Sequence, residues 1–457
     1  MSLRERCLLE AISNLRCGDC FAQTARNDTR SSGGTFVKTT LSFSNWISFL
    51  GRQARDWKVT VMRTSFDRLA YQMVFPYLSI YILALGASAT QLGFVISFGM
   101  MLAGLLAPFT GWYIDRIGPK KIYLLGIGML GVSYLTYGLA RDWTITFIAM
   151  IAYWVGFSVS NHSCATVCGN CLANSDRATG MMICETFGAG LLGMAGPILG
   201  AALVALFGGV NEAGIRPLFF LAFLFSLGTF VFVSVQLSNQ HWKPANAASP
   251  HLLRDLHQVL KDGRNLKRWL IIASIGGLPL GMVFPFSQVF AHEIKGANEF
   301  FLAAMVTCAA LSSILFAIPL GRLADKIGRK KILFATIPLF WLSNLILIWS
   351  PHPIFLLVAG ALQGFFYIGG PIAGAMEREL VPAEQMGRWL GIARLIKMLT
   401  NACFTALAGI VWDKVGPQFV FLTFVAIDLI VRVPLLLAMP ETLRLRTERA
   451  ALVESGD

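Results

Sequence analysis

Charged side chains inside long apolar runs are the first candidates for chemistry in this sequence. Glu185 lies in one such run, and Arg394 and Lys397 lie together in another. An ionisable group is costly to bury in an apolar environment, so these residues are candidates for a functional site. Two cations that face a carboxylate could bind an anion and couple its movement to a proton. A structural charge network would use the same residues, and the sequence leaves both interpretations open.

Composition indicates the environment of these apolar runs. The chain has 457 residues, of which 55% are hydrophobic and only 14% are charged. A soluble chain of this length needs more charge to cover its surface, whereas lipid can cover a membrane protein. The formal net charge of +13 is distributed between the apolar runs. This charge pattern indicates membrane topology, and we expect no nucleic-acid partner.

The apolar runs predict an all-α membrane protein with twelve transmembrane helices, because a spanning helix needs about 20 mostly apolar residues. The predicted spans are residues 64–85, 90–113, 121–140, 143–166, 178–206, 216–236, 268–291, 299–322, 331–350, 353–376, 387–412 and 417–439.

Polar segments divide these spans into domains. Residues 1–60 are predicted to be a partly disordered extension with an interfacial amphipathic helix near residues 41–58. Two six-helix bundles follow, at 61–236 and 268–440, with a basic linker at 237–267 and a tail at 441–457. The basic connections all lie on one side if both termini are cytoplasmic, as the positive-inside rule requires. We expect a multi-pass protein of the plasma membrane.

Two landmarks occur once in each half at nearly the same spacing. Residues 73–76 and 282–285 both read Met-Val-Phe-Pro. A Gly-x-x-x-Asp-Arg/Lys-x-Gly-x-Lys-Lys loop begins at Gly111 and again at Gly321. The halves are therefore predicted to be parallel repeats, an arrangement that places a substrate site between them.

The repeated loop predicts a latch. Gly111 and Gly321 are expected to end a helix at a sharp turn. Asp115 and Asp325 could accept hydrogen bonds from a neighbouring helix N-terminus, and the basic residues could form charge pairs that break in one gate state. A simple basic turn is the alternative. The gate-loop candidates are Gly111, Asp115, Arg116, Gly118, Lys120, Lys121, Gly321, Asp325, Lys326, Gly328, Arg329 and Lys330.

The two loops resemble the signature of the major facilitator superfamily, and the resemblance covers residues 60–440. It implies two six-helix bundles around a central cavity and rocker-switch alternating access. It also implies that some polar side chains face that cavity and could bind a polar substrate. These candidates are Tyr71, Gln72, Tyr77, Gln288, Gln363 and Tyr367. The sequence departs from the family's proton antiporters at Ala152, where those proteins carry an arginine.

Cysteines form a second polar cluster. Cys164, Cys168 and Cys171 share one helical face, and a soft-metal site there would need a fourth ligand such as His162 or Cys184. Packing of small residues also explains this face, and we predict no metal site and no cofactor.

The function that these patterns predict is secondary transport of a small organic solute. No nucleotide-binding loop or catalytic motif occurs, so we expect a non-enzyme. Coupling to protons is expected, with a preference for an organic anion. The alternatives are a multidrug exporter and a receptor or scaffold that does not transport. We expect a monomer whose partners are the solute, protons and the lipid bilayer.

Overall fold

The computed structural model describes residues 51, 53–172, 184, 192–239, 264–381 and 386–442. The chain from Ala54 onward forms one compact unit. Its described elements are all helices, which confirms the predicted all-α class. Glu185 and the central linker segment 240–263 lie outside the described residues.

The first half begins earlier than predicted. Its first helix, α4 (Arg55–Ala84), starts before the predicted boundary at residue 61, so that residues 55–58 belong to this helix. Asp56 accepts a 3.0 Å hydrogen bond from the backbone N–H of Ser238 and so ties the start of α4 to the residues after α10. The other described helices of this half are α5 (Ala89–Ile117), α6 (Pro119–Leu139), α7 (Trp143–Cys171), α9 (Leu192–Leu206) and α10 (Glu212–Gln236).

The second half repeats this succession of helices. Its first span is interrupted, because a π-helical turn, η2 (Pro279–Val283), separates α12 (Arg264–Gly276) from α13 (Phe284–Glu293). The following helices are α14 (Glu299–Ile327), α15 (Arg329–Trp349), α16 (Phe355–Leu380) and α17 (Met386–Lys414). The last span consists of α18 (Pro417–Ile427), η4 (Asp428–Arg432) and α19 (Val433–Leu437).

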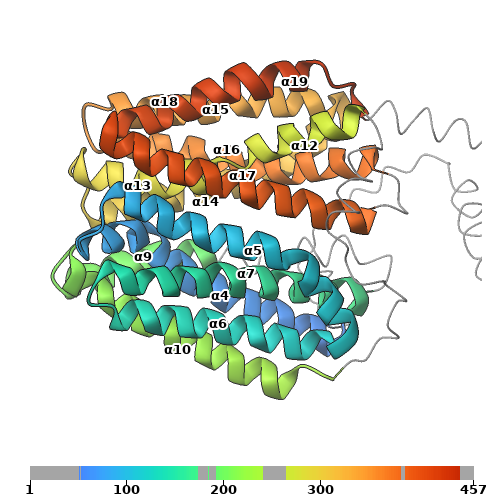
Figure 1. Ribbon diagram of the computed structural model, residues 1–457, viewed down its shortest axis with the longest axis horizontal. Coiled ribbons are helices and arrows are strands. Elements are labelled where there is room, and N and C mark those ends of the chain that lie inside the picture. The colour runs from blue at the N-terminus through green and yellow to red at the C-terminus, as the bar shows by residue number, and fades with distance from the viewer. Residues whose placement is uncertain are drawn as a thin grey trace, which may run out of the picture. The chain divides into compact units, whose positions relative to one another are not determined.

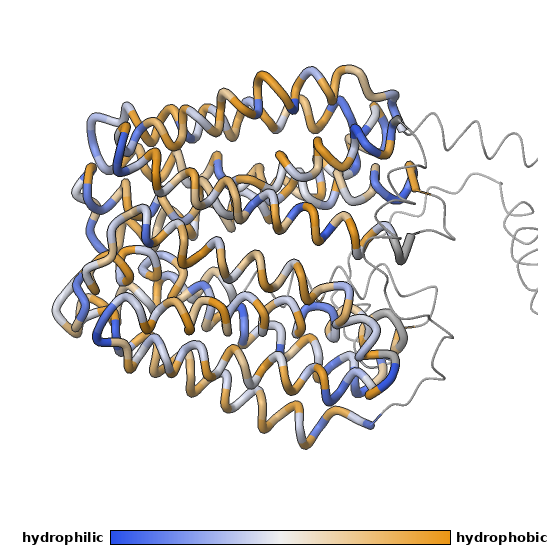
Figure 2. The backbone as a smooth tube through the Cα atoms, in the orientation of Figure 1, coloured by the Kyte–Doolittle hydropathy of each residue, from blue (hydrophilic) through white to orange (hydrophobic). Residues whose placement is uncertain are grey.

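Length and hydropathy fit most of these helices to a membrane. Ten of the described helical segments are long and apolar enough to cross one, while the segment Gly193–Leu206 is apolar but shorter. Figure 2 shows hydrophobic residues along the helices and hydrophilic ones gathered mainly near their ends. Within Ala54–Thr442, helices of the two halves run side by side (Figure 1).

The turns lie at two ends, named here by the helices that they join. At the α4–α5 end, Ser88 caps α5 by accepting a hydrogen bond from the backbone of Gln91. At the α5–α6 end, Gly118 and Gly328 have φ angles of +92° and +115°. These angles favour glycine, because a Cβ atom is strained in this region.

The prediction that Gly111 and Gly321 end helices is wrong. The two residues lie inside α5 and α14, which continue to Ile117 and Ile327. A Cβ atom at either position would meet nothing within 4 Å, so close packing does not require glycine there. In both copies the chain turns at the second glycine of the motif, Gly118 or Gly328, where φ is positive.

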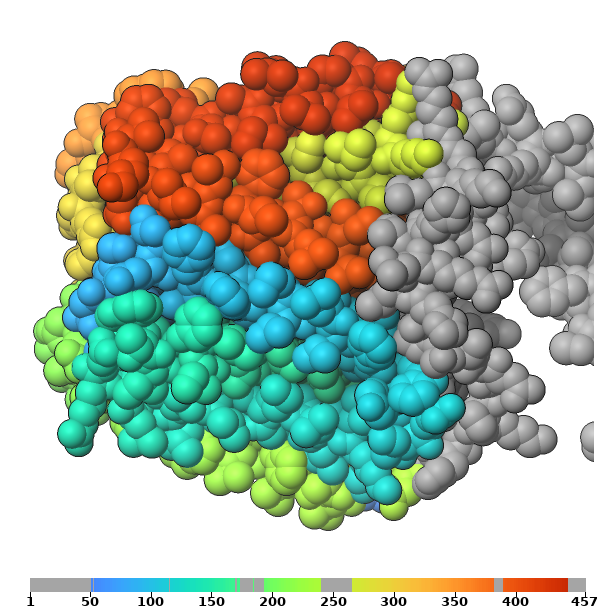
Figure 3. Space-filling view, viewed as in Figure 1, coloured from blue at the N-terminus to red at the C-terminus, as the bar shows by residue number. Residues whose placement is uncertain are grey.

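The two halves meet along α5 and α17, and also along α9 and α14. Figure 3 shows the surfaces of α5 and α17 in contact. Small residues permit this approach, since a Cβ atom on Gly93 would lie 2.8 Å from the carbonyl oxygen of Thr405. At the α4–α5 end, the backbone N–H of Thr90 donates a 2.8 Å hydrogen bond to Asp413.

Candidate functional site

A small pocket lies beside α4 in the first half. It is lined by Asp67, Arg68, Tyr71, Leu130, Tyr134, Tyr153 and Phe157. These side chains pack closely, and although the space around them counted out to solvent is about 210 Å³, this conformation leaves no room among them for a water molecule. Aromatic rings form most of its wall, and Tyr71 stacks on Tyr153 with ring centroids 5.9 Å apart. The pocket therefore combines flat apolar walls with two charged groups.

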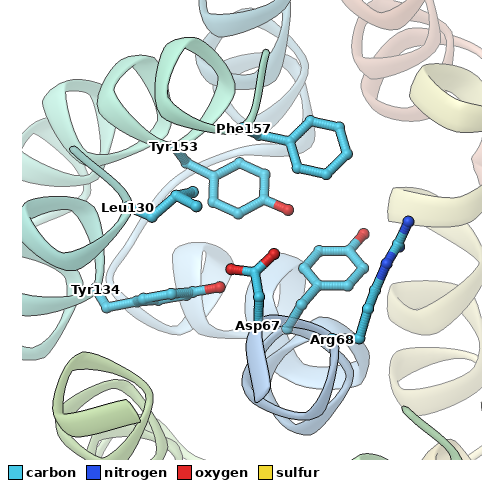
Figure 4. A pocket seen from close by; sticks show the side chains of 7 residues that line it. Asp67, Arg68, Leu130, Tyr134, Tyr153 and Phe157 are labelled. Carbon is cyan, nitrogen blue, oxygen red and sulfur yellow. The ribbon is translucent and has the colours of Figure 1, made fainter. Parts of the chain in front are cut away.

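The two charged residues of the pocket are neighbours in sequence but point in different directions. In Figure 4 the carboxylate of Asp67 points toward Tyr134 and Tyr153, whereas the side chain of Arg68 extends away from both. Asp67 Oδ1 lies 3.3 Å from Nη2 of Arg63, a guanidinium that is only 1% exposed. Asp67 is thus already paired inside its own helix. For Arg68, the described residues include no ion-pair partner.

The two cations of α17, Arg394 and Lys397, contact different partners. Nη1 of Arg394 lies 3.1 Å from Nε2 of His162 on α7. Nδ1 of the same histidine lies 2.9 Å from the carbonyl oxygen of Ser158. Arg394 therefore contacts the first half of the chain through a histidine.

Lys397 has a carboxylate partner within its own half. Its Nζ lies 3.2 Å from Oε2 of Glu377 on α16, and Trp389 donates a 2.7 Å hydrogen bond to the other oxygen of this carboxylate. Glu377 is only 7% exposed. A buried ion pair with a further hydrogen bond is stable only while both charges are present.

Tyr71 lines this pocket, and the other polar residues predicted for the cavity do not. Gln72 packs against α9, where a Cβ atom on Gly196 would lie 2.9 Å from its Cβ. Tyr77 is buried and donates a 2.9 Å hydrogen bond to the carbonyl oxygen of Glu299, so it joins α4 to the start of α14.

Three polar residues of the second half complete the predicted set. Gln288 and Gln363 are buried, and Oε1 of the first and Nε2 of the second have no hydrogen-bond partner among the described residues. Tyr367 stacks on Phe284 with ring centroids 5.5 Å apart. The two glutamines are therefore buried polar groups in the packed interior of the second half.

The repeated loop makes contacts within the first half. The guanidinium of Arg116 lies 4.1 Å from the centroid of the Trp112 ring. Lys120 donates a 2.7 Å hydrogen bond to the carbonyl oxygen of Leu237, the residue that ends α10. Lys121 is exposed, and the side chain of Asp115 is outside the described part of the chain.

The second copy of the loop is held by a carboxylate that we did not predict. Glu441 accepts hydrogen bonds from the backbone N–H groups of Arg329 (3.1 Å) and Lys330 (3.4 Å), at the start of α15. Asp325, the predicted acceptor, is instead 69% exposed and pairs with the side chain of Arg329 at 3.4 Å. Arg329 also pairs with Glu379 at 2.7 Å. Lys326 is exposed.

The thiols of the first half lie closer together than their sequence positions suggest. The Sγ atoms of Cys164, Cys168 and Cys184 all lie within 4.8 Å of one another. His162, considered as a further ligand, points instead to Arg394.

Sequence reasoning missed Glu377, Glu379 and Glu441, which complete the ion pairs and helix cap described above. Glu377 and Glu379 follow the predicted limit of their span at residue 376, and the structure extends α16 to Leu380. Glu441 follows the last helix, in a Pro-Glu-Thr sequence. A carboxylate next to a predicted helix end was the available signal.

Comparison with known proteins gives a family and several relatives. A sequence profile of the Major Facilitator Superfamily matches residues 64–306 and 269–454. The multidrug resistance protein MdtG of Salmonella arizonae is 25% identical over 296 residues, which cover 62% of this chain and 70% of that protein. MdtG of Yersinia enterocolitica is 25% identical over 346 residues, covering 73% and 79% of the two chains.

Solved structures of transporters share the fold. The nucleoside transporter NupG superposes with a TM-score of 0.62 at 16% identity, covering 83% of this chain and 98% of that one. The human organic anion transporter MFSD10 gives 0.60 at 19% identity, with 84% and 99% covered. A D-xylose–proton symporter gives 0.66 at 13% identity, with 88% and 99% covered.

Proposed function

The chain belongs to the major facilitator superfamily of membrane transporters, and on this premise we propose that it moves a small organic solute by alternating access. The solute carries a planar aromatic group and an anionic group. The pocket beside α4 supports this proposal, because it sets four aromatic side chains next to a cation, Arg68. Flat apolar walls with a few polar groups are typical of sites for small molecules.

The charges around the site favour an anion over a cation. The carboxylate of Asp67 is paired with Arg63 at 3.3 Å, so it is not available to a cationic solute without breaking that pair. Lys397 is likewise paired with Glu377 at 3.2 Å. Arg68 and Arg394 have no carboxylate partner among the described residues. An unpaired guanidinium binds carboxylate, sulfonate or phosphate groups with two parallel hydrogen bonds.

Alternating access requires contacts between the halves that can break at one end. Hydrogen bonds from Thr90 to Asp413 (2.8 Å) and from Tyr77 to Glu299 (2.9 Å) close the α4–α5 end. The gate-loop contacts described at the α5–α6 end stay within one half, as Lys120 with Leu237 does, so the Arg394–His162 contact between the halves (3.1 Å) would have to break for this end to open. We infer that the pocket opens toward the α5–α6 end. The positive-inside rule, applied to the twelve predicted spans, makes this end the cytoplasmic side.

Proton coupling would act through a buried carboxylate. Protonation of Glu377 would remove its pairing with Lys397 and leave the lysine charge unpaired. Protonation of Asp67 would do the same to Arg63. Protonation of either carboxylate changes the net charge inside one half of the protein, and so can stabilise one conformation relative to the other.

Export of lipophilic compounds is the second candidate function. The relatives from Salmonella and Yersinia are named as multidrug resistance proteins, and the aromatic wall of the pocket would also accept uncharged or cationic ring systems. The two candidates differ in the role of Arg68, which an anion needs and a lipophilic cation does not.

Flux into proteoliposomes separates these functions. We would reconstitute the purified chain and impose a pH gradient, then measure uptake of benzenesulfonate, which stays anionic, and of ethidium, a lipophilic cation. We expect gradient-dependent flux of benzenesulfonate. The substitution Arg68→Gln should lower it about tenfold, which corresponds to about 1.4 kcal/mol of lost binding, and Arg68→Lys should lower it less.

Arg141→Gln is the matched control, because Arg141 is an exposed cation in the turn before α7. It should leave the flux unchanged. Ethidium flux that survives Arg68→Gln, with no benzenesulfonate flux, would assign the chain to drug export. The absence of any gradient-dependent flux of either probe would contradict both proposals and favour a scaffold that does not transport.

A further inference from the structure

We propose that Cys164, Cys168 and Cys184 form a zinc site inside the first helix bundle. The three Sγ atoms lie within 4.8 Å of one another, and those of Cys168 and Cys184 are 4.0 Å apart. A tetrahedral zinc ion about 2.3 Å from each sulfur places its sulfur ligands about 3.8 Å apart. The thiol triangle therefore needs to contract by less than about 1 Å to hold the ion.

A hydroxyl group lies beside two of the three thiols. Oγ1 of Thr64, on α4, lies 3.7 Å from Sγ of Cys164 and 3.8 Å from Sγ of Cys184. These distances match the edges of a tetrahedron around one ion, about 3.6 Å between a sulfur and an oxygen ligand. Side chains from α4 and α7 thus come together with Cys184.

A buried cation lies beside the cluster. Arg63 is 1% exposed, and its positive charge interacts with Cys164. Nε of this arginine has no hydrogen-bond partner among the described residues, although its Nη2 pairs with Asp67. Zn²⁺ would offset two of the three thiolate charges, and Arg63, whose charge is shared with Asp67, would lie beside the remaining one.

Burial also distinguishes this cluster from ordinary surface thiols. Cys168 and Cys184 are 2% and 4% exposed, whereas Cys403 on α17 is exposed. Soft thiolate ligands select zinc or monovalent copper over magnesium or calcium. We assign zinc because three protein ligands suffice for it when a water molecule takes the fourth position. This proposal differs from the sequence-based expectation of no metal site, and the titration below decides between the two.

Metal titration tests the site in the intact protein. The full-length chain is purified under reducing conditions, stripped with a chelator, and titrated with Zn²⁺ against a chromophoric chelator. We expect one Zn²⁺ per chain. Cys168→Ser and Cys184→Ser should each weaken binding at least tenfold, while Cys403→Ser binds as the unmodified protein does. Cd²⁺ should give thiolate charge-transfer absorption that both cluster variants lose.

A second measurement guards against misfolded variants. Zn²⁺ should raise the melting temperature of the unmodified chain and of Cys403→Ser but not of Cys168→Ser, because a ligand stabilises only a folded protein that binds it. Equal Zn²⁺ affinity in the cluster and control variants would overturn the proposal. Retention of Cu⁺ without any Zn²⁺ binding would overturn the assignment to zinc.

Discussion

Lys120 donates a 2.7 Å hydrogen bond from its ammonium group to the backbone carbonyl oxygen of Leu237. Lys330, the equivalent residue of the second loop, donates to the carbonyl oxygens of Leu437 (2.8 Å) and Met439 (2.7 Å). In both halves the loop lysine therefore binds the end of the last helix of its own bundle. A cation at this position neutralises the carbonyl end of a helix, where the helix dipole is negative.

Removal of either lysine should destabilise its bundle. We expect Lys120→Met and Lys330→Met each to lower the free energy of unfolding by about 2 kcal/mol, the value of a hydrogen bond from a charged donor. Unfolding of the detergent-solubilised protein by a denaturing detergent would measure this. Lys121→Met and Lys331→Met are matched controls, since both lysines are exposed, and they should have little effect. Equal losses in all four variants would show that net charge matters and the two contacts do not.

Glu441 should contribute more to the second loop than Asp325 does. Glu441 accepts hydrogen bonds from two backbone N–H groups at the start of α15, where a carboxylate is favoured. We expect Glu441→Ala to lower the melting temperature, with a cost of about 1 kcal/mol, as for loss of a helix cap. Asp325→Ala should change it little, because Asp325 is 69% exposed and its partner Arg329 keeps Glu379. The reverse order of effects would restore Asp325 as the functional acceptor.

The helical architecture could be predicted because apolar runs and repeated motifs are local signals. Helices α7 and α14 begin at the predicted residues, Trp143 and Glu299. Gly118 and Gly328 belong to the repeated motif, but spacing alone did not distinguish them from Gly111 and Gly321. The distinction depends on backbone φ angles, which are +92° and +115° at the true turns.

The partners of the charged residues could not be predicted, because they come from other helices or from residues outside the predicted spans. Lys397 pairs with Glu377, which the predicted limit of its span had excluded. Arg394 meets His162, a residue considered earlier only as a metal ligand. Asp428 and Arg432 pair at 3.2 Å within one segment, because the two lie one helical turn apart.

A double-mutant cycle should show whether Lys397 acts on solute or only on Glu377. Each single substitution, Glu377→Gln or Lys397→Met, leaves a buried polar group unpaired and should destabilise the protein by about 3 kcal/mol, whereas the double substitution should cost less than the sum. Chemical denaturation measures these values, and flux of benzenesulfonate measures function. If the pair is structural, the double variant should recover transport. Loss of flux in the double variant despite restored stability would assign Lys397 to solute binding or coupling.

Contact between the halves at the α4–α5 end should depend on Gly409. A Cβ atom at this position would lie 2.4 Å from the carbonyl oxygen of Ala89, so alanine must push α5 and α17 apart. We expect Gly409→Ala to destabilise the closed α4–α5 end by about 1–3 kcal/mol, the usual cost of overpacking. Disulfide formation between Thr90→Cys and Asp413→Cys measures closure, because the two residues face each other across the α5–α17 contact, and this cysteine pair, which lacks the Asp413 hydrogen bond, is the reference for the rate.

The crosslink should form at least tenfold more slowly when Gly409→Ala is added to this cysteine pair. Gly228→Ala on α10 is the control, since a Cβ atom there would meet nothing within 4 Å, and it should leave the rate unchanged. Flux should fall with Gly409→Ala, because a carrier that seldom closes this end completes fewer cycles. An unchanged crosslinking rate in a well-folded Gly409→Ala protein would mean that α5 and α17 do not separate here, and the closed end would have to be sought at the α9–α14 contact.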